Sequence, residues 1–227
     1  MTWPAIAGQM NDRRAETPSA VSSELSSSAD SGVRPELQAL LSMVAASHRK
    51  LCPRQVLGVR MGLFAGRLLG LEVPRTDRRL VTIVETDGCF ADAVAVATGC
   101  AVGARTLRVA DYGKVAAVFA HAQSGQSVRL VPHAGVREAS LLIAPMAPNR
   151  WVGQLLGYQR LPDEDLFTST RVRLDPPLHA LLSRPGIRVP CDACGEEILN
   201  EREIRVGSRN LCRGCAGGAY YKIRAMT

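Results

Sequence analysis

Residues 80–100 read LVTIVETDGCFADAVAVATGC, and this stretch is the most informative one about the fold. Its first six residues are rich in β-branched side chains and predict a strand. Asp87 and Gly88 then lead into a helix over residues 89–98, for which Gly99 is the expected stop. A strand that turns directly into a helix is typical of a mixed domain of helices and strands.

The segment before this unit predicts a helix that begins at Pro53 and runs to residue 69. Gly58, Gly62 and Gly66 recur every four residues and therefore lie along one stripe. Each glycine lowers helix stability by about 1 kcal/mol, so the stripe predicts the close approach of another helix or backbone. The alternative is a weakly helical, glycine-rich segment. A shorter helix is expected over residues 35–47.

The segment after residue 100 predicts further strands. Residues 106–110 and 115–120 are expected to pair as a hairpin around the turn Asp111-Tyr112-Gly113-Lys114. Residues 127–131 are expected to add a strand, followed by two helices over 137–146 and 149–158. Strands interspersed with helices, including a hairpin, favour the α+β class.

Four regions follow from composition. Residues 1–33 are rich in Ser and Ala without periodic apolar positions, which predicts a disordered tail. Residues 34–160 form the predicted α+β core domain, residues 161–187 a linker rich in proline and charge, and residues 188–227 a small finger. No internal repeat is visible.

Bulk properties narrow the classes of function. No apolar run reaches the roughly 18–20 residues that span a bilayer, and no secretory leader is recognisable, so we expect a cytoplasmic protein. The net charge is +7. The basic residues are mostly scattered arginines, a pattern more typical of a solubility feature than of a nucleic-acid footprint.

The C-terminal region carries two close cysteine pairs, Cys191/Cys194 and Cys212/Cys215, separated by seventeen residues. This spacing is typical of a four-cysteine zinc site. Gly195 permits the tight turn after the first pair, and the second pair is expected at a helix start. Because four thiolates close the coordination shell, we expect a structural zinc ion; redox-active pairs are the alternative.

A second group of thiols lies in the core. Cys52 precedes Pro53 at a helix N-terminus, a position that stabilises a thiolate, and His48 lies four residues earlier as a candidate base or co-ligand. Cys89 and Asp92 are expected on one helix face, with Cys100 just beyond the helix end. The simpler interpretations are small buried thiols and an aspartate that only complements the helix dipole.

These residues resemble the FmdE family, which takes its name from a component of formylmethanofuran dehydrogenase. Its members carry an HGHxCPG-like segment followed by a glycine-rich helix with a G-x-R-x-G core, and many end in a four-cysteine finger similar to the DksA–TraR type. The resemblance covers roughly residues 36–135 and 188–221. The matching segments here are HRKLCPR (48–54), GVRMG (58–62), Cys89 with Asp92, Thr98-Gly99-Cys100 with Gly103, and Asp111–Lys114.

The resemblance implies an α+β core, dimerisation and a cleft around Cys and Asp residues. It also implies a setting of molybdenum- or tungsten-dependent formylmethanofuran or formate-type metabolism, with a large oxidoreductase as partner. Two positions depart from the family pattern, because Lys50 replaces the second His and Arg54 replaces the Gly after Cys-Pro. A metal site that needs both histidines would lack one ligand here.

Three hypotheses follow from these residues. In the first, a core cleft binds a metal or small ligand or performs thiol chemistry. In this cleft, Cys52 is the expected nucleophile or ligand, and His48 is the expected base or co-ligand. Cys89 and Cys100 are expected to be further ligands for a second metal, or resolving thiols. Asp92 would orient a partner group, and Lys114 would contact an anion. In the second, the chain is a regulator whose finger contacts nucleic acid or polymerase. In the third, it is a scaffold protein with a degenerate site.

Overall fold

The computed structural model describes residues 33–182, 186–222 and 224. The predicted disordered tail, residues 1–33, therefore falls outside the described part of the chain except for Val33. No helix within the described ranges is both long and apolar enough to cross a membrane.

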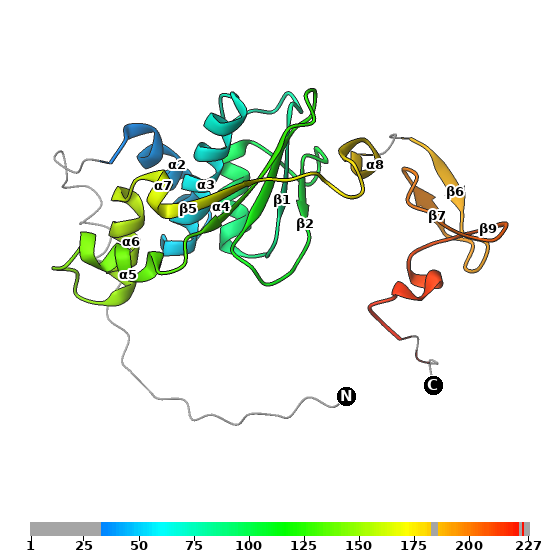
Figure 1. Ribbon diagram of the computed structural model, residues 1–227. Coiled ribbons are helices and arrows are strands. Elements are labelled where there is room, and N and C mark those ends of the chain that lie inside the picture. Colours follow the sequence, from blue (N-terminus) through cyan, green and yellow to red (C-terminus); the bar gives the residue numbers. More distant parts are fainter. Residues whose placement is uncertain (1–32, 183–185, 223, 225–227) are drawn as a thin grey trace. The chain divides into compact units, whose positions relative to one another are not determined.

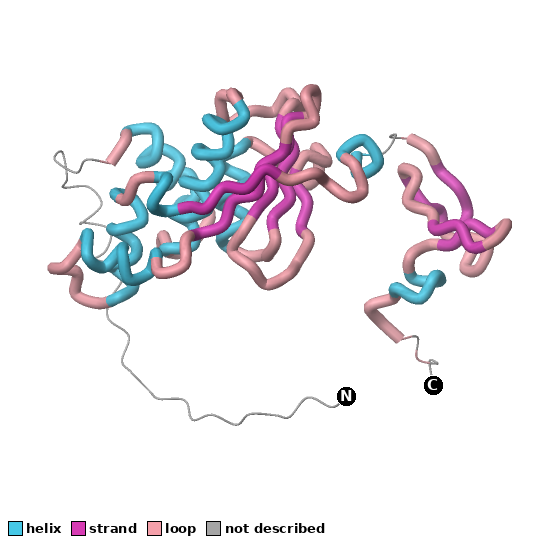
Figure 2. Tube along the Cα trace, in the orientation of Figure 1, coloured by secondary structure: helices cyan, strands magenta, loops and turns pink. Residues whose placement is uncertain are grey.

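The core is built on a five-stranded sheet of order β2-β1-β3-β4-β5. Figure 2 shows the strands of this sheet side by side, with helices packed against them. The predicted strand and helix of residues 80–98 are confirmed as β1 (Leu80–Val84) and α4 (Cys89–Thr98). The other strands are β2 (Leu107–Val109), β3 (Ala117–His121), β4 (Ser127–Pro132) and β5 (Phe167–Arg171). The α+β class is therefore correct.

The predicted hairpin over residues 106–120 is wrong. β2 pairs in parallel with β1, while β3 pairs antiparallel with β1 on its other side and with β4. The Asp111–Lys114 turn crosses the end of β1 instead, because the amides of Tyr112 and Lys114 both donate to the Glu85 carbonyl oxygen. The parallel pair requires the α4 crossover, which local turn chemistry does not reveal.

Close packing of α3 (Pro53–Leu69) on α4 explains the glycine stripe and confirms that prediction. A Cβ at Gly58 would lie 2.7 Å from both the Ala93 Cβ and the Phe90 carbonyl oxygen, and one at Gly62 would lie 2.7 Å from the Ala97 Cβ. Contacts advance in the same direction along both helices, so α3 and α4 run parallel and their N-termini meet. Both helices pack against the sheet (Figure 1).

The remaining core helices are α2 (Pro35–Ala46), α5 (Val136–Ile143), α6 (Arg150–Arg160), α7 (Asp163–Leu166) and α8 (Leu178–Leu182). The predicted helices over 137–146 and 149–158 are confirmed as α5 and α6. Buried Arg60 of α3 joins α6 and α7 to the core. Its guanidinium donates to the carbonyl oxygens of Tyr158 and Leu161 and to Asp163 Oδ1 at 2.6–3.0 Å. Arg60 thus holds the C-terminal end of α6 against α3.

Residues 161–187 differ from the expected linker. They contribute α7, α8 and β5, which pairs with β4 over five residues at the sheet edge. The sequence looks like a connector because β5 reads FTSTR, whose last four side chains are all exposed. The core domain therefore extends beyond residue 160.

The finger consists of two short antiparallel hairpins and a helical turn. The hairpins are β6 (Arg188–Pro190) with β7 (Glu197–Leu199), and β8 (Ile204–Val206) with β9 (Arg209–Leu211), followed by η1 (Gly214–Gly218). Its buried core, within the described residues, is Cys191, Ile198 and Leu211. So small an apolar core indicates that another interaction must stabilise the finger.

Candidate functional site

Two thiols meet where α3 and α4 begin. Cys52 is the residue that caps α3, Cys89 is the first residue of α4, and their Sγ atoms lie 3.2 Å apart. The parallel packing over Gly58 and Gly62 brings the two helix starts together. Gln55 fixes the entry of α3, since its Oε1 accepts a 2.7 Å hydrogen bond from the Cys52 amide. The structure thus joins two cysteines that are 37 positions apart.

The surroundings of Cys89 favour its protonated form. Partial burial, and then the adjacent Cys52 thiol, raise the pKa of Cys89 to about 11, although the Arg54 guanidinium acts in the opposite direction. Cys89 is therefore a protonated thiol at neutral pH. Helix N-termini favour negative charge, and both sulfurs lie at such an end.

His48 and Asp92 lie at the same helix starts. His48 Nε2 is 3.2 Å from Asp92 Oδ2, and Asp92 shares the first turn of α4 with Cys89. Four of the predicted site residues, Cys52, Cys89, His48 and Asp92, are thus gathered at the N-terminal ends of α3 and α4. The aspartate side chain is 60% exposed, so it carries no burial cost in this Ala/Val-rich helix.

The structure places Cys100 apart from this group. It lies beyond the opposite end of α4, a helix of ten residues that extends about 15 Å. Its thiol is 3% exposed and lies 3.5 Å from both the Thr82 hydroxyl and the Leu80 carbonyl oxygen. Cys100 is a buried packing residue and not a ligand or resolving partner of Cys52. The length of the helix separates it from the site despite its closeness in sequence.

Lys114 is exposed, and its Nζ lies 5.9 Å from the centre of the Tyr112 ring. Its neighbours Gly113 and Val115 line a cavity beside Cys52. The predicted anion contact by Lys114 therefore stays a prediction. Lys50, the departure from the family pattern, has its Nζ 5.3 Å above the Trp151 ring.

A cavity of about 700 Å³ opens beside Cys52. Its lining comes mainly from α3, α6 and the start of α5, and each of these helices contributes both polar and apolar side chains. Sequence reasoning did not connect α5 or α6 with Cys52. Trp151 and Arg137 were missed as site residues, because only folding brings α6 and α5 to α3; Arg54 was noted only as a departure from the family pattern. The cavity lining includes Cys52, Arg54, Arg137, Glu138, Trp151 and Tyr158.

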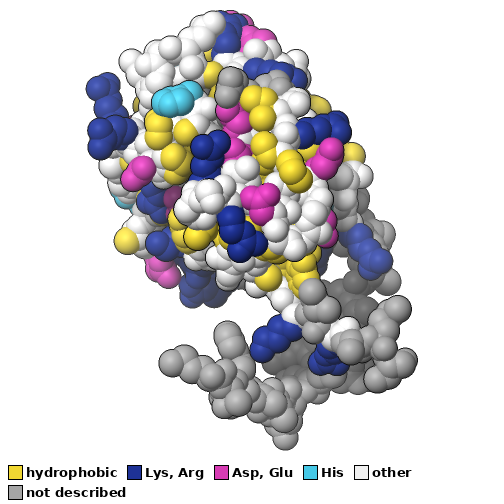
Figure 3. Space-filling model, turned by 90° about the vertical axis from the view of Figure 1, so that its right-hand side faces the viewer, with side chains coloured by type: hydrophobic (Ala, Val, Ile, Leu, Met, Phe, Trp, Pro, Cys, Tyr) yellow, Lys and Arg dark blue, Asp and Glu magenta, His cyan; other side chains and the backbone are white. Residues whose placement is uncertain are grey.

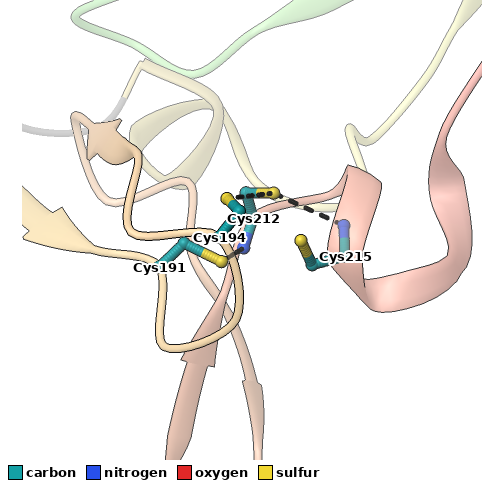
Figure 4. Close-up of side chains that lie close together, drawn as sticks. All are labelled: Cys191, Cys194, Cys212 and Cys215. Carbon is teal, nitrogen blue, oxygen red and sulfur yellow. Dashed lines mark hydrogen bonds between the residues drawn. The ribbon is translucent and has the colours of Figure 1, made fainter. Parts of the chain in front are cut away.

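The four finger cysteines converge as the spacing predicts (Figure 4). The turn between β6 and β7 carries Cys191 and Cys194, with Gly195 at φ +75°; Cys212 follows β9, and Cys215 lies in η1. All four sulfurs lie within 4.8 Å of one another. A tetrahedral zinc ion with Zn–S bonds of about 2.3 Å would separate its sulfurs by roughly 3.8 Å, so the tetrad fits the ion.

A backbone amide favours the thiolate form of one cysteine of this tetrad. The Cys212 amide donates to Cys191 Sγ at 3.2 Å, and hydrogen bonds of this kind lower the pKa of Cys191 to about 6. Crowding by the Cys212 and Cys194 thiols raises the pKa of Cys215 to about 12. A bound cation removes that repulsion and ionises the thiols. Within the described residues no other group brings three metal-ligating side chains this close, so a second metal in the core has no support.

Comparison with known proteins identifies both parts of the chain. Residues 47–167 match the family model described as FmdE, molybdenum formylmethanofuran dehydrogenase operon. Residues 186–221 match the prokaryotic dksA/traR C4-type zinc finger.

Two individual proteins are similar to the chain. It is 28% identical over 210 residues to a probable S-adenosyl-L-methionine-binding protein of Archaeoglobus fulgidus, with 83% of this chain and 55% of that relative aligned. The crystal structure of a tungsten formylmethanofuran dehydrogenase FmdE-like protein from Syntrophus aciditrophicus superposes with a TM-score of 0.51 at 23% identity. That match covers 82% of this chain and 95% of the other, and shows the fold alone. Because the family model spans more than half of the sequence, the chain belongs to the FmdE family and ends in a C4-type zinc finger.

Proposed function

We propose that the protein is an accessory protein of molybdenum- or tungsten-dependent formylmethanofuran or formate-type metabolism, and that its core cleft acts through the Cys52–Cys89 pair. The family supports the metabolic setting. The observation that carries the chemistry is the 3.2 Å contact between the two sulfurs beside the cavity. Two thiols at this distance can form a disulfide with a small shift of side chains.

The proposed chemistry is thiol–disulfide exchange with a disulfide-bearing acceptor. The Cys52 thiolate attacks one acceptor sulfur and releases the first thiol; Cys89 then attacks Cys52 and releases the second. The two electrons and two protons of the pair end on the released thiols. Cys52 is assigned the first attack because it lines the cavity, whereas Cys89 does not; burial and the adjacent thiol also raise the pKa of Cys89.

The second step has its own physical support. Once Cys52 is in the mixed disulfide, its thiol no longer raises the pKa of Cys89, so burial alone still raises this pKa and the Arg54 guanidinium opposes it. His48, whose Nε2 lies 3.2 Å from Asp92 Oδ2 at the same helix starts, is the proposed base for the Cys89 proton. Asp92 orients His48 in this arrangement and touches no reacting sulfur.

The cleft also suggests a class of ligand. Arg54 and Arg137 line the cavity together with Glu138, and the Trp151 and Tyr158 rings form part of its wall. Guanidinium groups bind carboxylates well, so the proposed ligand is a small carboxylate-bearing molecule. Formate fits the metabolic setting, and S-adenosylmethionine is suggested by the name of the Archaeoglobus relative, of which this chain spans 55%.

Isothermal titration of the reduced chain with formate and with S-adenosylmethionine tests this assignment. Binding of either that weakens about tenfold or more in Arg54→Ala/Arg137→Ala, but not in Arg173→Ala, an arginine outside the cavity lining, agrees with the proposal. If both probes bind the double variant as well as the parent, the carboxylate ligand is wrong. Thiol–disulfide exchange is tested separately, with the variants Cys52→Ser and Cys89→Ser.

A scaffold role with a degenerate site is the second candidate, and Lys50 favours it. Its ammonium group lies over Trp151 at the position where the family pattern has a histidine. In this alternative the chain forms a homodimer and supports a molybdenum or tungsten oxidoreductase. Light scattering tests the dimer. Co-purification of an oxidoreductase whose activity is unaffected by Cys52→Ala would support the scaffold over thiol exchange.

A further inference from the structure

Charge is divided unequally between the two halves of the finger. Residues 188–203 contain five acidic side chains and two arginines. Residues 204–224 contain no acidic side chain and five basic ones: Arg205, Arg209, Arg213, Lys222 and Arg224. On the face of the molecule drawn in Figure 3, basic side chains lie among acidic and hydrophobic ones. The net charge of the whole finger hides this division.

The basic side chains of the second half are available for a partner. Arg205, Arg213 and Lys222 are exposed, and none of them forms an ion pair with a described acidic residue. Arg209 donates to the Asp192 carbonyl oxygen, at 3.3 Å. In the first half, Arg188 is already paired with Glu197 at 3.2 Å.

Two aromatic rings accompany these charges. Tyr220 is 98% exposed and Tyr221 is 57% exposed, and their ring centres lie 5.2 Å apart, edge to face. The Arg213 side chain lies against Gly218, two residues before Tyr220, where a Cβ would come within 2.9 Å of Arg213 Cγ. Exposed aromatic faces close to the Arg213 side chain, which has no carboxylate partner among the described residues, point to a ligand that offers both flat rings and negative charge.

We propose that the basic half of the finger, defined by Arg205, Arg209, Arg213, Tyr220, Tyr221 and Lys222, binds single-stranded nucleic acid. Unpaired bases stack on tyrosine rings, while the arginines and the lysine contact the phosphates. Double-stranded nucleic acid hides its base faces in the stack. An acidic peptide would satisfy the arginines but would not use the tyrosine faces. This proposal is independent of the Cys52–Cys89 chemistry.

Fluorescence anisotropy of the full-length, zinc-loaded chain with a labelled 20-nucleotide single strand of uridines tests it. With three to five phosphate contacts, the logarithm of the binding constant should fall against that of salt concentration with a slope of about −2 to −3.5. Tyr220→Ala and Tyr221→Ala should each weaken binding about 5- to 150-fold, and the Phe variants should restore it. Arg213→Ala should reduce the slope by about 0.7.

Arg188→Ala is the matched control, because this arginine lies in the acidic half and is paired; it should change affinity less than about twofold. Unchanged zinc content shows that each variant keeps the finger folded. Four results would overturn the proposal: no binding at 25 mM salt, binding insensitive to both tyrosines, tighter binding of a duplex of equal length, or equally effective competition by polyglutamate. The last result would assign the surface to an acidic protein.

Discussion

Removing the Asp163 carboxylate should destabilise the core strongly. Asp163 is 6% exposed and Arg60 is 3% exposed, so Asp163→Ala leaves a buried guanidinium without its counter-charge. Breaking a buried pair in this way costs about 3–5 kcal/mol. Two carbonyl oxygens still accept from Arg60, so we expect about 3 kcal/mol, the lower end of that range. Arg34 and Arg67, which also contact Asp163, are half-exposed and add little.

Urea unfolding followed by circular dichroism measures this loss. With a slope near 2 kcal/mol/M, the midpoint should fall by about 1.5 M. Asp165→Ala is the control, because this aspartate lies on the same helix α7 but is exposed, and it should shift the midpoint by less than about 0.3 M. The double variant Arg60→Met/Asp163→Ala removes both charges and should be more stable than Asp163→Ala. Equal shifts for Asp163→Ala and Asp165→Ala would show that the buried pair does not stabilise the core.

Three further predictions concern packing, acid stability and zinc. Gly58→Ala should lower the free energy of unfolding, because overpacking costs about 1–3 kcal/mol and the gain in helix propensity is only about 1 kcal/mol. Urea unfolding measures the change. Gly103→Ala is the control, because nothing lies within 4 Å of the added methyl group there. Arg129 binds Glu85 through two hydrogen bonds and lowers its pKa below 4.5. This ion pair therefore stabilises the fold fully above the pKa that Glu85 has in the unfolded chain, and the stabilisation is lost as pH falls through the lower pKa of Glu85 in the folded state. The stability difference between the parent and Glu85→Gln should therefore shrink below about pH 4. A constant difference would contradict this. Chelation, or Cys191→Ser, should remove the one zinc ion that we expect per chain and make the finger protease-sensitive while the core unfolding transition stays unchanged; loss of the core transition would rule out an independent finger.

The sequence patterns that gave correct predictions are local ones. The glycine stripe predicted the α3–α4 contact, and the two cysteine pairs predicted the converging tetrad, because both depend on spacing within one element or one small module. The four residues at the helix starts could be named for the same reason. Each lies next to a recognisable helix N-terminus.

Non-local pairing accounts for what failed. The predicted pairing of residues 106–110 with 115–120 is wrong because strands adjacent in sequence favour a hairpin, whereas β2 reaches β1 through the α4 crossover. β5 was missed because its partner β4 lies more than 30 residues earlier and four of its side chains face solvent. Cys100 was grouped with Cys89 by sequence distance, although a whole helix separates them. Trp151 and Arg137 gave no signal because only the tertiary fold brings them to Cys52.

Peptide mapping after mild oxidation provides a decisive test of the Cys52–Cys89 chemistry. The full-length chain, saturated with zinc to protect the finger, is treated with oxidised dithiothreitol, digested and analysed by mass spectrometry. We predict a disulfide between Cys52 and Cys89 with Cys100 remaining a free thiol, and no core disulfide in Cys89→Ser. Free thiols at both Cys52 and Cys89, under conditions that oxidise a model dithiol peptide, would contradict the proposed thiol exchange.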